Sequence, residues 1–274
     1  MTIAARLRGP AAVRGAFSAA RVEGRAAFVV YLMAGFPSED EALACAVAAL
    51  EAGADVLEIG VPFSDPLADG PVVAEAGRVA LAAGGGISSA IRLARALRER
   101  GHEQPLLAMS YLNPLAAAGE AATMAALAGA GADGMILPDL PAGESPRFER
   151  LAAAHGLSLT FLVAPNSAPE RVEAAIRAST GFLYVVPLFG VAGVRSQLAV
   201  GAAELLDRMR GAAAGRTPVA AGFGISTAAQ MRALEPHADG LIVGSAIVAA
   251  ARDGGAAAVG ELVTVLRTSE AHDA

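Results

Sequence analysis

Acidic residues gather in one short stretch, residues 57–71, which reads LEIGVPFSDPLADGP. Glu58 lies inside an apolar run typical of a buried strand, where an unpaired carboxylate is costly. Because burial raises the pKa of a carboxyl group, such a residue suits acid–base work near neutral pH. We interpret Glu58 as a catalytic acid–base. The alternative is a structural ion pair, but only Arg195 lies close to a predicted strand end.

Three aspartates follow predicted strands, as residues at the C-terminal ends of strands do. Asp69 stands directly before a Gly-Pro pair where a helix is expected to begin, so by itself it is equally a helix N-cap or a catalytic residue. Asp65, next to a proline, and Asp139, in LPDLP, are interpreted as turn or interface residues. Tyr111 and Tyr184 end two predicted strands, where they either cap the core or line a pocket for a ring.

The residue types that are missing narrow the chemistry further. All 21 basic residues are arginine, so no lysine is present to form a Schiff base, which excludes class I aldolase chemistry and covalently held pyridoxal phosphate. The 4 histidines fall at predicted helix ends or in the tail, and Cys45 is the single cysteine, so no metal site is expected. We therefore predict no cofactor, with carboxylates as the proton-transfer groups.

The overall composition predicts an acidic protein that binds no nucleic acid and does not cross a membrane. The net charge is −6 with a pI of about 5.3, and no basic patch suggests a nucleic-acid partner. No apolar run approaches the roughly 18 residues that a membrane span needs. A single cysteine fits a reducing compartment, so a cytoplasmic location is expected.

Glycine-rich loops predict a phosphate site. GFGIST (222–227) and VGSAIV (243–248) each follow a predicted strand, and FGVAG (189–193) follows an earlier one. Glycine lets backbone N–H groups approach an anion, and a helix N-terminus attracts negative charge. The alternative is that these are only tight turns. Phe223, inside the first loop, could stack on the same ligand.

Strand-like runs alternate with Ala/Leu-rich helical segments along the chain, which predicts βαβ units and a parallel sheet. Eight units fit a (β/α)8 TIM barrel, with a doubly wound sheet as the second choice. In a TIM barrel the chemistry lies at the C-terminal ends of the strands, which is where Glu58 is expected. The predicted strands are 27–34, 55–60, 105–111, 133–138, 157–163, 181–186, 218–224 and 239–244.

The N-terminus is rich in arginine, as transit peptides are, but we favour an amphipathic helix at about 13–23 with Val13, Phe17 and Val22 on its apolar side. The fold is thus expected to be a TIM barrel with an extra N-terminal helix. A single domain over residues 1–274 is expected, with flexible ends at 1–12 and 269–274.

The stretch LEIGVPFSDPLADGP resembles the signature of the tryptophan synthase alpha chain family. The resemblance runs from about residue 13 to residue 266 and includes YLNPL, DGMILPDLP, GFGIST and VGSAIV. It implies a TIM barrel that cleaves indole-3-glycerol phosphate to indole and glyceraldehyde 3-phosphate, a retro-aldol reaction without metal or Schiff base. It also implies a pyridoxal-phosphate beta chain as the partner in an α2β2 heterotetramer.

The resemblance assigns roles to individual residues. Glu58 would be the general acid–base, and Asp69 would accept a hydrogen bond from the indole N–H. The implied substrate pocket is Tyr184, Tyr31, Met109, Tyr111, Phe223 and Ala192; the implied phosphate-binding residues are Gly193, Gly224, Gly244 and Ser245; the implied partner interface is Asp65, Pro66, Asn113 and Asp139.

Two positions depart from the family pattern. Ala192 and Met33 stand where the family carries threonine. The missing hydroxyl at Ala192 would otherwise bond the catalytic aspartate, at a cost of about 1 kcal/mol for an uncompensated buried bond. Two alternatives therefore stay open: a stand-alone indole-3-glycerol phosphate lyase or related retro-aldolase of secondary metabolism, and a catalytically weak regulatory subunit.

Overall fold

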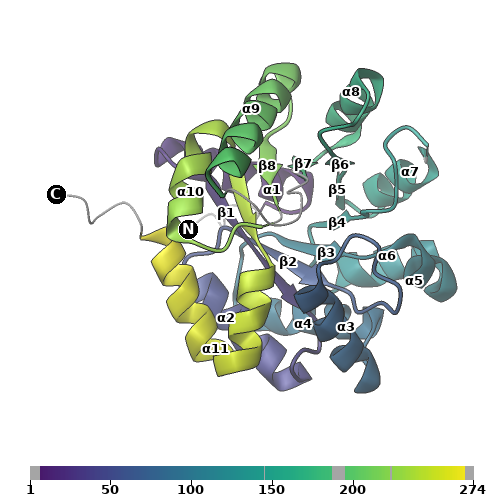
Figure 1. Ribbon diagram of the computed structural model, residues 1–274. Coiled ribbons are helices and arrows are strands. Elements are labelled where there is room, and N and C mark those ends of the chain that lie inside the picture. Colours follow the sequence, from purple (N-terminus) through teal and green to yellow (C-terminus); the bar gives the residue numbers. More distant parts are fainter. Residues whose placement is uncertain (1–6, 145, 187–194, 223, 269–274) are drawn as a thin grey trace, which may run out of the picture.

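A ring of helices encloses parallel strands in the computed structural model, which describes residues 7–144, 146–186, 195–222 and 224–268 (Figure 1). The strands are β1 (Ala27–Met33), β2 (Val56–Gly60), β3 (Leu106–Met109), β4 (Gly134–Ile136), β5 (Ser158–Thr160), β6 (Leu162–Val163), β7 (Leu183–Val185), β8 (Val219–Ala221) and β9 (Gly240–Val243). The helices are α1 (Pro10–Val22), α2 (Glu39–Glu51), α3 (Pro71–Ala82), α4 (Ile87–Glu99), α5 (Leu112–Ala118), α6 (Glu120–Gly129), α7 (Pro146–Ala154), α8 (Pro169–Ala178), α9 (Arg195–Ala213), α10 (Ala228–Leu234) and α11 (Ser245–Arg267), with a 3-10 turn η1 (Glu235–His237).

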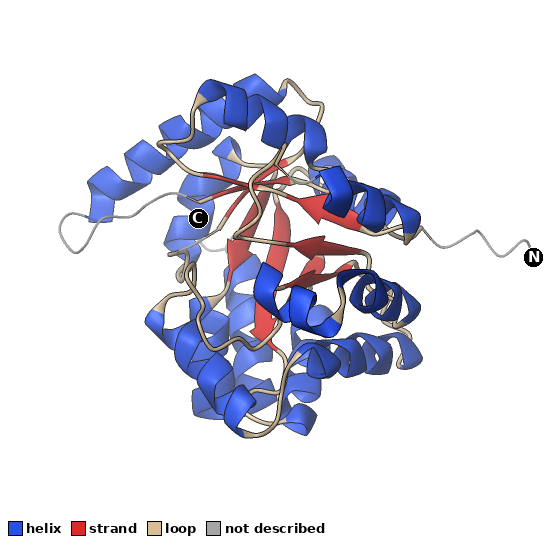
Figure 2. Ribbon diagram, turned by 90° about the vertical axis from the view of Figure 1, so that its right-hand side faces the viewer, coloured by secondary structure: helices blue, strands red, loops and turns tan. Residues whose placement is uncertain are grey.

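The strand order confirms the predicted barrel. All strand pairings among the described residues are parallel, and the order β5-β4-β3-β2-β1-β9-β8-β7-β6 leaves only β5 and β6 at the two ends of the sheet. These two strands are consecutive in the chain, so the sheet returns on itself. Figure 2 shows the strands in the middle of the molecule with helices on either side.

The predicted strand 157–163 is divided into β5 and β6 at Phe161. Here side-chain hydroxyls take the place of backbone acceptors: Phe161 N–H donates to Ser179 Oγ at 3.2 Å, and Leu159 N–H donates to Thr180 Oγ1 at 2.9 Å. The barrel wall is therefore closed at this seam partly by side chains. This seam, residues 158–163 facing 179–180, is a feature that periodicity does not predict.

Helix α1 covers the N-terminal end of the barrel and confirms the predicted extra helix. Its buried residues are Val13, Phe17 and Ala20, and the Phe17 ring lies 5.2 Å from the Phe182 ring between centroids. The prediction that Val22 belongs to the apolar side is wrong, because its side chain is 88% exposed. Val22 follows Val13 by nine positions, which at about 100° per residue places it on the opposite face of the helix.

Aspartates that precede strands join neighbouring strands at the same end of the barrel. Asp55, Asp133 and Asp239 each stand just before a strand and accept a backbone N–H from the adjacent strand, at distances of 2.7, 3.0 and 2.8 Å. Asp133 is completely buried and also accepts from Gly9 N–H and from Arg98, at 2.9 and 2.6 Å. The recurring Asp at strand starts is thus a structural device at the N-terminal ends of the strands.

Several helix details differ from the predicted pattern. Helix α5 was not predicted; its Pro114 lies in the first turn, where proline is accepted. Ser38 caps α2 by accepting from Glu41 N–H, at the Ser-x-x-Glu spacing typical of a helix start. The Glu41 carboxylate, however, accepts from Ala256 N–H at 2.9 Å, where α11 is kinked at Gly255.

The ends of the chain lie largely outside the described residues. Helix α1 begins at Pro10, inside the segment 1–12 that was predicted to be flexible, and residues 1–6 and 269–274 are not described. The single-domain organisation stays a prediction. Within the described part, no helix combines the length and apolar character that a membrane crossing requires.

Candidate active site

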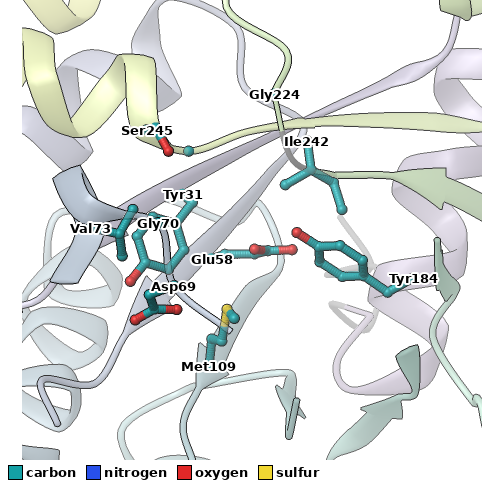
Figure 3. A pocket seen from close by; sticks show the side chains of 11 residues that line it. Tyr31, Glu58, Asp69, Gly70, Val73, Met109, Tyr184, Gly224, Ile242 and Ser245 are labelled. Atoms are coloured by element: carbon teal, nitrogen blue, oxygen red, sulfur yellow. The ribbon is translucent and has the colours of Figure 1, made fainter. Parts of the chain in front are cut away.

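A pocket opens at the C-terminal ends of the strands (Figure 3), and its empty space, including the part open to solvent, is about 440 Å³. Its walls come from β1, β2, β3, β7 and β9, from the loop between β2 and α3, and from the start of α11. The lining residues are Tyr31, Glu58, Asp69, Gly70, Val73, Met109, Tyr184, Gly224, Ile242, Gly244 and Ser245. The barrel thus brings together residues that lie far apart in the sequence.

Glu58 lies at the centre of this pocket on β2. Its side chain is fully buried, and neither carboxylate oxygen has a hydrogen-bond partner among the described residues. Burial raises the pKa of Glu58 to about 8 because no charge partner offsets the loss of solvation. The carboxyl group is consequently largely protonated at neutral pH, so it begins as a proton donor and becomes a base once it has lost its proton.

Asp69 enters the pocket from the loop before α3 and is held by Tyr111. The Tyr111 hydroxyl donates to Asp69 Oδ1 at 3.1 Å and accepts from Ala68 N–H at 2.9 Å. Burial raises the pKa of Asp69, and the hydrogen bond from Tyr111 acts in the opposite direction. Asp69 is not the N-cap of α3, because that position is Gly70 and makes no side-chain cap bond.

Two tyrosine hydroxyls reach into the pocket over glycines. A Cβ on Gly60 would lie 2.0 Å from Tyr31 Oη, and a Cβ on Gly222 would lie 2.2 Å from Tyr184 Oη. In Figure 3 the Tyr184 hydroxyl points toward the Glu58 carboxylate from the opposite wall. The two glycines therefore leave the space that both hydroxyls occupy.

We expect Gly222→Ala to lower the free energy of unfolding by about 1–3 kcal/mol, because the new methyl group overlaps the Tyr184 ring and hydroxyl. Urea unfolding followed by circular dichroism measures this change. The matched control is Gly211→Ala in α9, where a Cβ meets no atom within 4 Å. This control should gain about 0.5–1 kcal/mol from helix propensity. Equal stability of both variants would contradict the packing argument.

The glycine loops lie beside the acids at one side of the pocket. Gly244 precedes the first turn of α11, which begins at Ser245, and Gly224 adopts a φ of +82° that favours glycine. A helix N-terminus and an open backbone together suit an anion. Thr227, rather than Ser226, caps α10. The predicted site residues Ala192, Gly193 and Phe223 lie outside the described residues.

The residues predicted to face a partner lie on loops and in the first turn of α5, at the same end of the barrel. Asp65 and Asn113 are exposed, and Pro66 is half-buried. Asp139 is half-buried, and both of its oxygens accept the Leu112 N–H at 3.1 and 3.0 Å, at the start of α5. Leu67 follows Pro66 in the loop between β2 and α3. Its side chain is 89% exposed and forms an apolar projection on this rim.

Sequence reasoning missed part of the pocket wall. Val73 and Ile242 line it, and Gly60 and Gly222 make room for the tyrosines. Ile242 could have been found, because it stands two positions before Gly244 and so faces the same side of β9. The glycines had no comparable signal, since their role depends on side chains that cross over from other strands.

The fold and the site together define a TIM-barrel enzyme whose pocket brings the carboxyl groups of Glu58 and Asp69 together with the start of helix α11. A family model described as tryptophan synthase alpha chain matches residues 17–272. The chain belongs to the tryptophan synthase alpha chain family.

Individual relatives agree with this assignment. The chain is 44% identical over 256 residues to a tryptophan synthase alpha chain from Deinococcus radiodurans, covering 92% of this chain and 93% of the relative. It is 43% identical to one from Streptomyces coelicolor, covering 84% of each. Among solved structures, tryptophan synthase from M. tuberculosis in an aminoacrylate-bound form superposes with a TM-score of 0.84 at 34% identity, covering 94% of this chain and 98% of that one.

Proposed function

We propose that this protein cleaves indole-3-glycerol phosphate to indole and glyceraldehyde 3-phosphate as the alpha chain of a tryptophan synthase. The observation that carries the proposal is the placement of Glu58 and Asp69 in one pocket with the start of α11. The relatives carry the alpha-chain name, which favours this function over a stand-alone lyase or a regulatory subunit.

Glu58 would perform both proton transfers. Its protonated carboxyl group donates to the ring carbon that bears the side chain, which leaves a positively charged ring and a Glu58 carboxylate. The carboxylate then takes the proton of the neighbouring side-chain hydroxyl. The carbon–carbon bond breaks, its electron pair returns to the ring as indole leaves, and the oxygen becomes the aldehyde carbonyl. Glu58 ends in its initial protonated form.

Asp69 would stabilise the charged ring. Its carboxylate accepts a hydrogen bond from the ring N–H and offsets the positive charge that forms after protonation. This role requires the ionised form, which the hydrogen bond from Tyr111 favours. The phosphate group would bind at Gly224, Gly244 and Ser245, where the start of α11 supplies backbone N–H groups. The same role is proposed for Gly193.

We expect Tyr111→Phe to reduce kcat/KM about 10- to 100-fold, because Asp69 loses the donor that orients it and favours its charge. The acidic limb of the kcat/KM profile should move to higher pH, since a lost hydrogen bond to the carboxylate raises the pKa of Asp69. Steady-state assays of indole release across pH measure both effects. An unchanged acidic limb would show that Tyr111 does not act through Asp69.

The partner is proposed to be a tryptophan synthase beta chain in an α2β2 assembly. The rim residues Asp65, Pro66, Asn113 and Asp139 lie in the segments that follow β2, β3 and β4 and would meet this partner. We also propose a cytoplasmic location, which the single cysteine and the biosynthetic relatives support.

An assay of indole release by the purified chain, alone and with a beta chain, tests the function. Slow turnover alone that rises when the beta chain is added is the expected result. Full turnover that a beta chain does not raise would identify a stand-alone lyase. Folded protein that releases no indole under either condition, yet raises beta-chain activity, would identify a regulatory subunit.

A further inference from the structure

Two hydroxyl groups on β5 are buried without a hydrogen-bond partner. Ser158 and Thr160 stand two positions apart on this strand, and the two residues are 0% and 2% exposed. Among the described residues neither Ser158 Oγ nor Thr160 Oγ1 has a partner. Burying a hydroxyl without a hydrogen bond is costly, and native proteins rarely leave one in that condition. Each of these two oxygens therefore needs a partner.

Both hydroxyls face the interior of the barrel. Residues two apart on a strand share a face, and the alternate residues, Leu159 and Phe161, belong to the apolar core that includes residues of α7 and α8. Ser158 is in register with Gly134 on β4, and a Cβ on Gly134 would lie 1.9 Å from Ser158 Oγ. The Ser158 hydroxyl thus takes the space that a side chain at Gly134 would fill.

The two oxygens converge on Gly181, across the seam. A Cβ on Gly181 would lie 3.3 Å from Thr160 Oγ1 and 3.4 Å from Ser158 Oγ, and its nearest contact would be Val13 Cγ1 of α1 at 3.2 Å. A rise of about 3.3 Å per residue keeps the side chains of residues i and i+2 apart, and these hydroxyls are not bonded to each other. Both nevertheless reach the same position, beside a residue that has no side chain.

The side chains next to this position are apolar. Ile136 is in register with Thr160, and Phe182 follows Gly181 in the chain. Both of these residues, like Val13, belong to the apolar cluster of the barrel interior. None of the three can donate to or accept from a hydroxyl. The partner that the two oxygens need must therefore be a small molecule that can both donate and accept a hydrogen bond.

We propose that one water molecule is bound inside the barrel between Ser158 Oγ and Thr160 Oγ1, beside Gly181, and closes the inner face of the seam. The water accepts the proton of one hydroxyl and donates to the oxygen of the other. Both hydroxyls then have a partner, and the water has two hydrogen bonds, the smallest number typical of buried water. The water supplements the hydroxyls of Ser179 and Thr180, which replace backbone acceptors in the same seam.

A high-resolution crystal structure of the protein tests the site directly. Density for a water is expected at about 2.7–3.0 Å from both Ser158 Oγ and Thr160 Oγ1. The same density should be absent from the double variant Ser158→Ala, Thr160→Val, which keeps the strand but offers no hydroxyl. Wild-type density without a water within hydrogen-bond distance of both oxygens would overturn the proposal.

The stability of Thr160→Val gives a second test, because the two possibilities predict opposite signs. Valine keeps the shape of the side chain and removes the hydroxyl, so a bound water loses one of its two partners and Tm should fall by about 2–4 °C. A hydroxyl without a partner would instead be relieved of its burial cost, and a rise in Tm would contradict the water. The matched control is Thr217→Val, whose buried hydroxyl donates to Ile176 O at 3.0 Å and whose loss should lower Tm.

A double-mutant cycle tests whether the two hydroxyls share one water. Ser158→Ala, Thr160→Val and the double variant are compared with the wild type by thermal unfolding. Because a shared water is lost with the first hydroxyl, the second substitution should lower Tm by less than it does alone. Additive shifts would show that each hydroxyl has its own partner and would overturn the shared site. None of these measurements depends on indole release, so the outcome is independent of the proposed function.

Discussion

Glu58→Gln is expected to reduce kcat for indole release by about 10³- to 10⁴-fold, because glutamine can neither donate nor accept the transferred proton. The substitution keeps the size of a fully buried side chain, so binding of a phosphorylated indole ligand should be retained. Single-turnover assays with excess enzyme separate the chemical step from binding. A variant that keeps more than about a tenth of the wild-type rate would remove Glu58 from the proton transfers.

The stability of the same variant provides a control that does not depend on activity. Burial raises the pKa of Glu58 in the folded protein from 4.5 to about 8, so between these values the native state holds a proton that the unfolded chain has lost. The wild type therefore loses stability as pH rises through this interval, on the order of a few kcal/mol in total. Glu58→Gln lacks this loss and should exceed the wild type in unfolding free energy at pH 8 and above. Parallel pH dependences of the two proteins would contradict the raised pKa.

Asp133→Ala is expected to lower the unfolding free energy by about 3–5 kcal/mol, the largest stability effect among the substitutions considered. The carboxylate is fully buried and accepts from Arg98, Gly9 N–H and Leu106 N–H, so its removal strands a partly buried arginine and two backbone donors. The substitution also removes the hydrogen bond from Gly9 N–H, which holds the segment before α1 against the barrel. Urea unfolding measures the loss.

The matched control is Asp253→Ala, which removes an aspartate whose ion pair with Arg252 is exposed to solvent. Surface pairs contribute about 0–1 kcal/mol, so this variant should unfold close to the wild type. If Asp133→Ala were as mild as the control, the aspartates before the strands would be incidental. Activity of folded Asp133→Ala should be near normal, because Asp133 lies at the end of the barrel away from the pocket.

The fold was predictable because its signals are local. The alternation of strand-like and helical runs, the cap at Ser38 and the apolar strand around Glu58 each depend on neighbouring residues. Glu58 was singled out for the same reason, since it breaks an apolar run, whereas the local sequence left Asp69 open between a helix N-cap and a site residue, and only the family resemblance gave it a role. A carboxyl group inside an apolar run stands out in the sequence when no arginine lies near it, because an ion pair then does not explain its burial.

What could not be predicted depends on contacts between distant segments. The division of the fifth strand at Phe161 comes from hydroxyls at Ser179 and Thr180, and no periodicity reports which hydroxyl replaces a carbonyl. The space above Gly60 and Gly222 exists only once tyrosines from other strands cross it. Val22 was assigned to the wrong face of α1, because the apolar residues were counted without regard to their angular position around the helix axis.

The seam at Phe161 gives the barrel wall a point of adjustable width. Elsewhere neighbouring strands share backbone ladders, which cannot lengthen without losing pairs, whereas a hydroxyl on a rotatable side chain follows a small displacement. β7 follows the seam and carries Tyr184, which is in register with Leu162 of β6 and whose N–H donates to Phe161 O at 3.0 Å. The backbone ladder therefore resumes at the residue whose phenol faces Glu58, so the side-chain bonds of the seam end just before the pocket wall.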